Sequence, residues 1–202
     1  MFVYFVLTFV LMAAFFLFIG MRVVLTKRPY FMSSRYFFVF MILAFSPQFV
    51  STAWMITKDL PGNANIIFYL NPLLFIFLLA FLWIQMKGYM AIGVSDDSFR
   101  DALTFSLNKN NLPFEEQLSI VKLTSIDAIL QVAIQSWIGT GQIKLKRSKG
   151  ANVLPQIVSG LDDYYAENDI KPNNITPVFY IIIGIFMLIF AGVFYYIFPE
   201  PC

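Results

Sequence analysis

Polar side chains without charge interrupt two long apolar stretches of this sequence, and such groups need a hydrogen-bond partner wherever they lie in lipid. Gln48 and Thr52 are four residues apart, which places them on one face of a helix. A proline inside a helix frees a backbone carbonyl that neighbouring polar side chains can satisfy. We name these residues the polar seam, with predicted helix kinks at two prolines: Ser46, Gln48, Ser51, Thr52 and Asn71, with Pro47 and Pro72. The seam either holds two helices together through hydrogen bonds or admits water or an ion along a bent path.

Within the segment 87–171, basic residues gather once, at Lys144, Lys146, Arg147 and Lys149. This basic patch is typical of the solvated end of a strand, and it also suits contact with anionic lipid headgroups or a negatively charged partner. Aromatic side chains of the kind that stack on unpaired bases are not interleaved with it. We therefore expect membrane lipids or a protein at this patch, and no direct binding of nucleic acid.

A mixed polar and aromatic group precedes the basic patch in a stretch where apolar residues alternate with polar ones. Gln131, Gln135 and Trp137 are spaced by even numbers of residues. Alternate side chains of a strand point to the same side of a sheet, so these three share one face. We name them the candidate partner face, because a soluble protein can bind such a surface.

Catalytic and metal-binding chemistry finds little support in the residue types. The chain has no histidine and a single cysteine, Cys202, so the usual zinc and iron ligand sets are absent. The paired acids at 96–97 and 162–163 suit a helix start and a solvated helix face better than general acid and base catalysis. The segment 139–141 lacks the lysine and the length of a phosphate-binding loop. We therefore expect a protein that is not an enzyme and needs no cofactor or metal.

The composition indicates a protein that is surrounded by lipid, because 59% of the residues are hydrophobic and only 13% are charged. Ordinary soluble domains carry about 25% charged residues. An α-helix crosses the hydrocarbon layer with about 20 apolar residues, and four stretches reach that length. We predict an α-helical integral membrane protein with four transmembrane helices, three before and one after an inserted domain, at about 2–25, 36–57, 66–86 and 176–198.

Basic residues near the ends of spans predict the orientation, because short positively charged loops stay in the cytoplasm. The loop between the first two spans holds Arg22, Lys27, Arg28 and Arg35 and no acidic residue. We therefore expect the N- and C-termini outside and the inserted segment 87–171 in the cytoplasm.

The segment 87–171 departs from the apolar pattern and is typical of a small α+β domain. A strand at 88–94 precedes a helix that begins after Ser95 and ends near 110–111. Strands are predicted at 118–124, 128–137 and 142–147, the last two joined by a turn at 139–141, and an amphipathic helix covers about 151–168. The predicted domain thus has the order strand, helix, three strands, helix. It comes after residues 1–86, which contain three spans. Residues 172–202 supply the fourth span and a short outer tail.

These features together favour a membrane subunit without enzymatic activity. We expect it to form a homo-oligomer or to join a membrane complex, and to bind a soluble cytoplasmic protein through its α+β domain. Because the domain is tethered to spans at both ends, it can relay a membrane signal to that partner. The alternative is an oligomeric pore or channel whose path follows the polar seam.

In span number and size the chain resembles the small multi-span subunits of bacterial defence systems, such as the membrane partner of the Kiwa system, which works with a soluble protein. The resemblance implies a bacterial inner membrane as the location and a role in anti-phage defence. The basic bias of the first loop fits that location.

Overall fold

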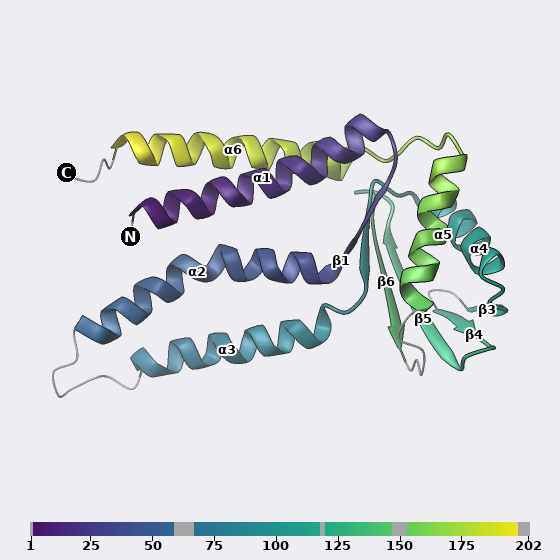
Figure 1. The fold of residues 1–202 in the computed structure, drawn as a ribbon, viewed down its shortest axis with the longest axis horizontal. Coiled ribbons are helices and arrows are strands. Elements are labelled where there is room, and N and C mark those ends of the chain that lie inside the picture. The colour runs from purple at the N-terminus through teal and green to yellow at the C-terminus, as the bar shows by residue number, and fades with distance from the viewer. Residues whose placement is uncertain (1, 59–66, 118–119, 147–152, 198–202) are drawn as a thin grey trace. The chain divides into compact units, whose positions relative to one another are not determined.

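Helices and one antiparallel sheet make up the computed structural model, which describes residues 2–58, 67–117, 120–146 and 153–197 (Figure 1). Most of the described residues are helical. The chain divides into two compact units. The helical unit comprises 1–16, 35–86 and 183–202, and the sheet unit comprises 17–34 and 87–182. Helices α1 (Phe2–Thr26) and α6 (Ile175–Ile197) contribute turns to both units.

The helical unit combines parts of α1 and α6 with two further helices, α2 (Ser34–Lys58) and α3 (Ile67–Gln85). Aromatic rings pack between these helices. Phe15 of α1 stacks on Phe40 of α2 with 4.7 Å between ring centroids. Phe49 of α2 meets Phe75 of α3 edge to face at 4.1 Å. Aromatic ring contacts therefore join α2 to α1 on one side and to α3 on the other.

Among the residues that the structure describes, two helices are long and apolar enough to cross a membrane, over Val3–Thr26 and Ile175–Ile197. They coincide with the first and the fourth of the four predicted spans. A shorter apolar helical segment, Pro72–Ile84, lies within the third predicted span. Helix α2 occupies the second predicted span and contains Pro47 in its interior, as α3 contains Pro72.

A six-stranded antiparallel sheet forms the sheet unit, with the strand order β1-β2-β6-β5-β4-β3. In chain order its strands are β1 (Tyr30–Ser33), β2 (Tyr89–Ile92), β3 (Phe114–Gln117), β4 (Ile120–Leu123), β5 (Ala128–Gln135) and β6 (Thr140–Lys146). Strand β6 pairs with β5 over residues 129–135 of β5, whereas β4 pairs only with residues 128–131. The second half of β5 therefore extends beyond β4.

Helices α4 (Asp96–Lys109) and α5 (Val153–Glu167) cover one face of the sheet and lie side by side (Figure 1). The Ser106 hydroxyl of α4 donates a hydrogen bond of 2.6 Å to the Ile157 carbonyl of α5. The helix predicted after Ser95 is confirmed as α4, which buries five residues at helical spacing: Phe99, Ala102, Leu103, Ser106 and Leu107. Ser95 is the N-cap of this helix and forms a capping box with Ser98.

The predicted order of the insert is wrong in one respect, because the described residues between α4 and α5 form four strands rather than three. The additional strand, β3, begins at Phe114 directly after Pro113 and forms a hairpin with β4, with Phe114 opposite Leu123. Its sequence, Phe-Glu-Glu-Gln, is short and mostly polar, so it carries no clear alternation of apolar residues. The cross-strand pairing with β4 decides its conformation instead.

A sixth strand, β1, comes from the segment predicted as the loop between the first two spans. Tyr30 to Ser33 pair with β2, with Tyr30 opposite Ile92. The turn predicted at 139–141 lies earlier in the chain, at 136–139, since Thr140 and Gly141 already belong to β6.

Candidate functional site

The turn between β5 and β6 is hydrogen-bonded to the first turn of α6. It consists of residues 136–139. The N–H groups of Ile138 and Gly139 both donate to the Gln135 carbonyl, at 3.1 and 2.9 Å. The remaining polar groups of the turn are therefore available to the segment before α6.

Asn173 fastens that segment to the turn. Its Nδ2 donates to the Ser136 carbonyl at 2.7 Å, and its Oδ1 accepts the backbone N–H of Ile175 at 3.0 Å. Its backbone N–H donates to the Gly93 carbonyl, in the loop after β2, at 2.9 Å. One side chain and its backbone thus join a turn of the sheet, a second loop and the first residue of α6.

Thr176, in the first turn of α6, adds a second attachment. Its hydroxyl and its backbone N–H both donate to the Ile138 carbonyl, and the residue is buried. The Gly93 N–H in turn donates to the Gly139 carbonyl at 2.7 Å. We name this network the junction, and define it by residues Gly93, Ser136, Ile138, Gly139, Asn173 and Thr176.

Two glycines permit the close approach within the junction. Gly139 has a φ of +75°, and a Cβ on it would lie 2.7 Å from the Cβ and Cγ of Asn173. Gly93 has a φ of +87°, and a Cβ there would lie 2.9 Å from Val23 Cγ1 of α1. Any larger residue is strained at either position and displaces its neighbour. The junction therefore requires the two glycines.

The last turns of α1 also contact the sheet unit. The Arg22 guanidinium lies 4.3 Å from the centre of the Tyr30 ring in β1, and Arg28 Nη2 donates to the Ala166 carbonyl at 3.1 Å. Burial raises the pKa of the Asp162 carboxyl in α5, and the positive charge of Arg22 opposes that rise. Two basic residues that predict a cytoplasmic loop thus have contacts to α5 and β1.

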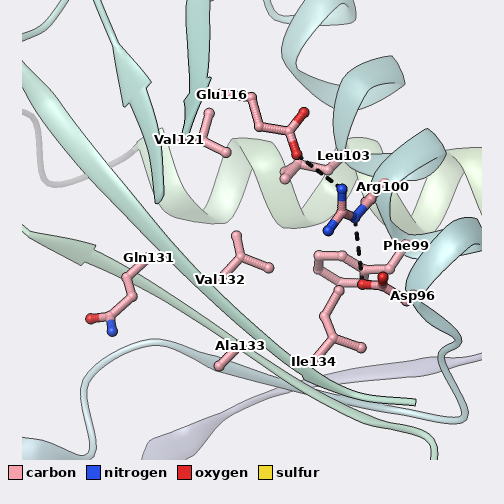
Figure 2. Close-up of a pocket in the computed structure, with 10 residues that line it drawn as sticks. All are labelled: Asp96, Phe99, Arg100, Leu103, Glu116, Val121, Gln131, Val132, Ala133 and Ile134. Carbon is pink, nitrogen blue, oxygen red and sulfur yellow. Dashed lines mark ion pairs between the residues drawn. The ribbon is translucent and has the colours of Figure 1, made fainter. Parts of the chain in front are cut away.

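A cleft of about 440 Å³ lies between α4 and the second half of β5 (Figure 2). Arg100 stands at its mouth, with Nε 3.5 Å from Asp96 Oδ1 and Nη1 3.6 Å from Glu116 Oε1. These three side chains are about half exposed, so the ion pairs contribute little to stability. The walls are mostly apolar side chains: Phe99, Leu103, Val121, Val132 and Ile134. We name this cavity the β5 cleft.

The sequence-predicted candidate partner face and basic patch meet on the sheet. Gln131 of β5 lies opposite Lys144 of β6, and both border a small hollow together with Ala133 and Gln142. Lys146 is exposed at the end of β6. Arg147 and Lys149 lie outside the described residues.

The other two residues of the candidate partner face lie at the end of β5 and in the junction turn. Gln135 is exposed, and Trp137 exposes 77% of its surface. Trp137 therefore belongs to the turn that carries the attachment of α6, rather than to a strand.

Two hydroxyl groups of the polar seam donate hydrogen bonds to carbonyls of their own helix. The Ser46 hydroxyl donates to the Leu43 carbonyl at 2.6 Å, and the Thr52 hydroxyl donates to the Gln48 carbonyl at 2.9 Å. Such bonds within one helix need no partner from another span.

A cavity of about 220 Å³ adjoins part of the seam, bordered by Gln48, Thr52 and Pro72 among aromatic and aliphatic side chains. Ser51 is half-buried on α2. Asn71 lies in α3, and its side chain is outside the described residues. The structure thus brings Gln48 and Thr52 of the seam to one cavity.

The junction and the ion pairs of the cleft are functional candidates that sequence reasoning missed. Asn173 stands in a short polar linker where asparagine is an ordinary turn residue. Arg100 and Glu116 lie on different elements, so their spacing carries no signal. Gly93 and Gly139 were the available hint, since a glycine after a strand often marks a turn or a close backbone approach.

Among the residues that the structure describes, no group of three or more His, Cys, Asp or Glu side chains is placed to hold a metal ion. Comparison with protein-family models, with curated proteins and with solved structures finds no match.

Proposed function

We propose that this protein is a non-enzymatic membrane subunit that binds a soluble partner through its sheet unit and relays changes in its apolar helices to that partner. The observation that carries the proposal is the junction, where α6 is hydrogen-bonded to a turn of the sheet through Asn173 and Thr176. A free tether would need no such bonds.

Exposed apolar side chains support four spans rather than two. On α3, Leu73, Ile76 and Phe77 expose 64%, 64% and 72% of their surfaces. Surfaces of this kind are costly in water and are covered by lipid or by another protein. On α2, Tyr36 and Trp54 are exposed near opposite ends of the helix, as expected at the headgroup level. In the proposed orientation the sheet unit is cytoplasmic, both termini are outside, and the membrane is a bacterial inner membrane.

The relay follows from the bonds at the start of α6. A rotation or shift of α6 moves Thr176 and Asn173, and both are bonded to the turn that carries Trp137. Short hydrogen bonds to backbone carbonyls leave little room for independent motion of the two elements. A change in the packing of α6 therefore alters the position of an exposed aromatic side chain.

The proposed binding of a soluble partner rests on the exposed surface around Trp137. Trp137 is the kind of residue that anchors protein interfaces, and Gln135 lies beside it at the end of β5. Lys144 and Lys146 add positive charge on the neighbouring strand. The expected partner is a soluble cytoplasmic protein with an acidic surface, and a role in anti-phage defence fits such a pair.

Asn173→Ala tests the junction, because it removes two side-chain hydrogen bonds. At about 1 kcal/mol for each bond, the attachment of α6 weakens by about 1–2 kcal/mol. Hydrogen exchange of the Gly93 and Gly139 amides, measured on the full chain in mild detergent, is then expected to rise about tenfold. Asn174→Ala changes the neighbouring, exposed asparagine and serves as the control. Equal exchange in the two variants would contradict the relay.

An oligomeric pore is the second candidate function, and one observation favours it. Gln48 and Thr52 border a cavity of about 220 Å³ beside Pro72 in the helical unit. Polar residues within a span face the interior of a helix bundle or a water-filled cavity, and an oligomer can align such cavities into a path.

A further inference from the structure

Among the described residues, no strand pairs with the second half of β5 on the side opposite β6, and we name this side the open edge. Strand β4 pairs with β5 only as far as Gln131, whereas β6 continues to Gln135. In an antiparallel sheet, alternate residues direct their backbone N–H and C=O groups to each side of the strand. Some of the backbone groups of 132–135 therefore face the side that β4 leaves open. Within the described part of the chain, no strand pairs with them there.

This edge lacks the features that protect other sheet edges from pairing. Proteins protect an edge with charged residues, prolines or bulges. The outer strand β3 carries Glu115 and Glu116. By contrast, residues 132–134 are Val-Ala-Ile, with neither charge nor proline. An apolar edge of this kind is suited to receive a further strand.

The β5 cleft lies directly along the open edge and offers a place for the side chains of such a strand. Figure 2 shows Val132 on the cleft side of β5, facing Leu103 and Arg100, while Gln131 and Ala133 point to the other side. The cavity of about 440 Å³ has apolar walls on both the sheet and α4. Two carboxylates and one guanidinium leave one net negative charge at its mouth.

We propose that the open edge of β5 binds an extended segment of the soluble partner as an added strand, with aliphatic side chains of that segment in the β5 cleft. Main-chain hydrogen bonds supply affinity in this mode of recognition, and the pocket supplies specificity for alternate side chains. A basic residue in the segment suits the carboxylates of Asp96 and Glu116. This inference rests on the proposed docking function and names its binding surface.

The test uses the full chain in mild detergent and a fluorescein-labelled peptide, Lys-Thr-Val-Thr-Ile-Thr-Val-Lys. A control peptide replaces the isoleucine by proline, which cannot donate to the edge. We expect fluorescence anisotropy to show binding of the first peptide about tenfold tighter than the second. Hydrogen exchange over 132–135 should slow when the first peptide is added.

Val132→Lys places a charge on the edge and should weaken peptide binding by about tenfold or more. Gln142→Lys is the matched control, because Gln142 lies on β6 beside Gln131 and Lys144 in the separate hollow. The exchange measurement on the unsubstituted chain tests the edge even where Val132→Lys fails to fold.

Three results would overturn the inference: no peptide binding, equal binding by Val132→Lys, or no slowing of exchange over 132–135. Without peptide, protection of the amides of 132–135 that increases with protein concentration would also overturn the inference. It would indicate that a second copy of the chain binds at this edge. Should a soluble partner remain bound to the full chain while the edge amides stay unprotected, only the inference fails. If no soluble partner binds at all, the proposed function fails with it.

Discussion

Gly160→Ala is expected to loosen the helical layer that forms one wall of the β5 cleft. A Cβ at position 160 would overlap Ser106 Oγ and lie 2.9 Å from Ser106 Cβ, so α4 and α5 have to separate. Overpacking of this kind costs about 1–3 kcal/mol. Loss of the hydrogen bond between Ser106 and Ile157 adds about 1 kcal/mol, and the better helix propensity of alanine returns about 1 kcal/mol. The net loss is about 2 kcal/mol.

Hydrogen exchange of α4 and α5 in the full chain measures this loss, and about 2 kcal/mol corresponds to roughly 30-fold faster exchange. Gly192→Ala in α6 is the matched control, because a Cβ there meets nothing within 4 Å. Ser106→Gly combined with Gly160→Ala should recover part of the loss, and the double-mutant cycle isolates that coupling. Unchanged exchange in Gly160→Ala, or a coupling of zero, would refute the reasoning.

Three further predictions concern pH, docking and the pore. Burial raises the pKa of Tyr165 to about 12, above its ordinary value of 10.0, so its contribution to stability is complete below pH 10 and lost as pH rises to 12. Tyr165→Phe should flatten the fall of unfolding free energy in that range, and an unaltered slope would speak against it. Lys144→Glu with Lys146→Glu should release a co-purifying soluble protein, whereas full retention would exclude the basic patch. Gln48→Leu should change conductance in reconstituted bilayers if a pore exists, and absence of any conductance would eliminate that function.

Local patterns predicted several elements of the sheet unit well. Acids after Ser95 and the spacing of Phe99, Leu103 and Leu107 predict α4, because a helix start and a buried stripe are both encoded within a few turns. The alternation of Leu130, Val132 and Ile134 predicts β5 for the same reason. Strands β1 and β3 were missed, since four residues with little alternation become strands only through their partners.

The candidate site depends on contacts that no local pattern contains. Arg100 and Glu116 come from different elements, and Asn173 reaches Ser136 across 37 residues of sequence. The open edge arises because β5 is longer than β4 in the pairing register, and neither strand alone reveals that difference. The sequence identifies the residues of the polar seam. Only the structure shows that Ser46 and Thr52 form hydrogen bonds within α2.

The sequence by itself determined the division of this protein into apolar and polar segments, because hydrophobicity and charge are properties of residues and need no fold. Tertiary structure alone decided that the polar segment is attached to α6 through the junction and that one edge of β5 is left open. Junction and edge both depend on which backbone groups find partners, and pairing between distant segments settles that.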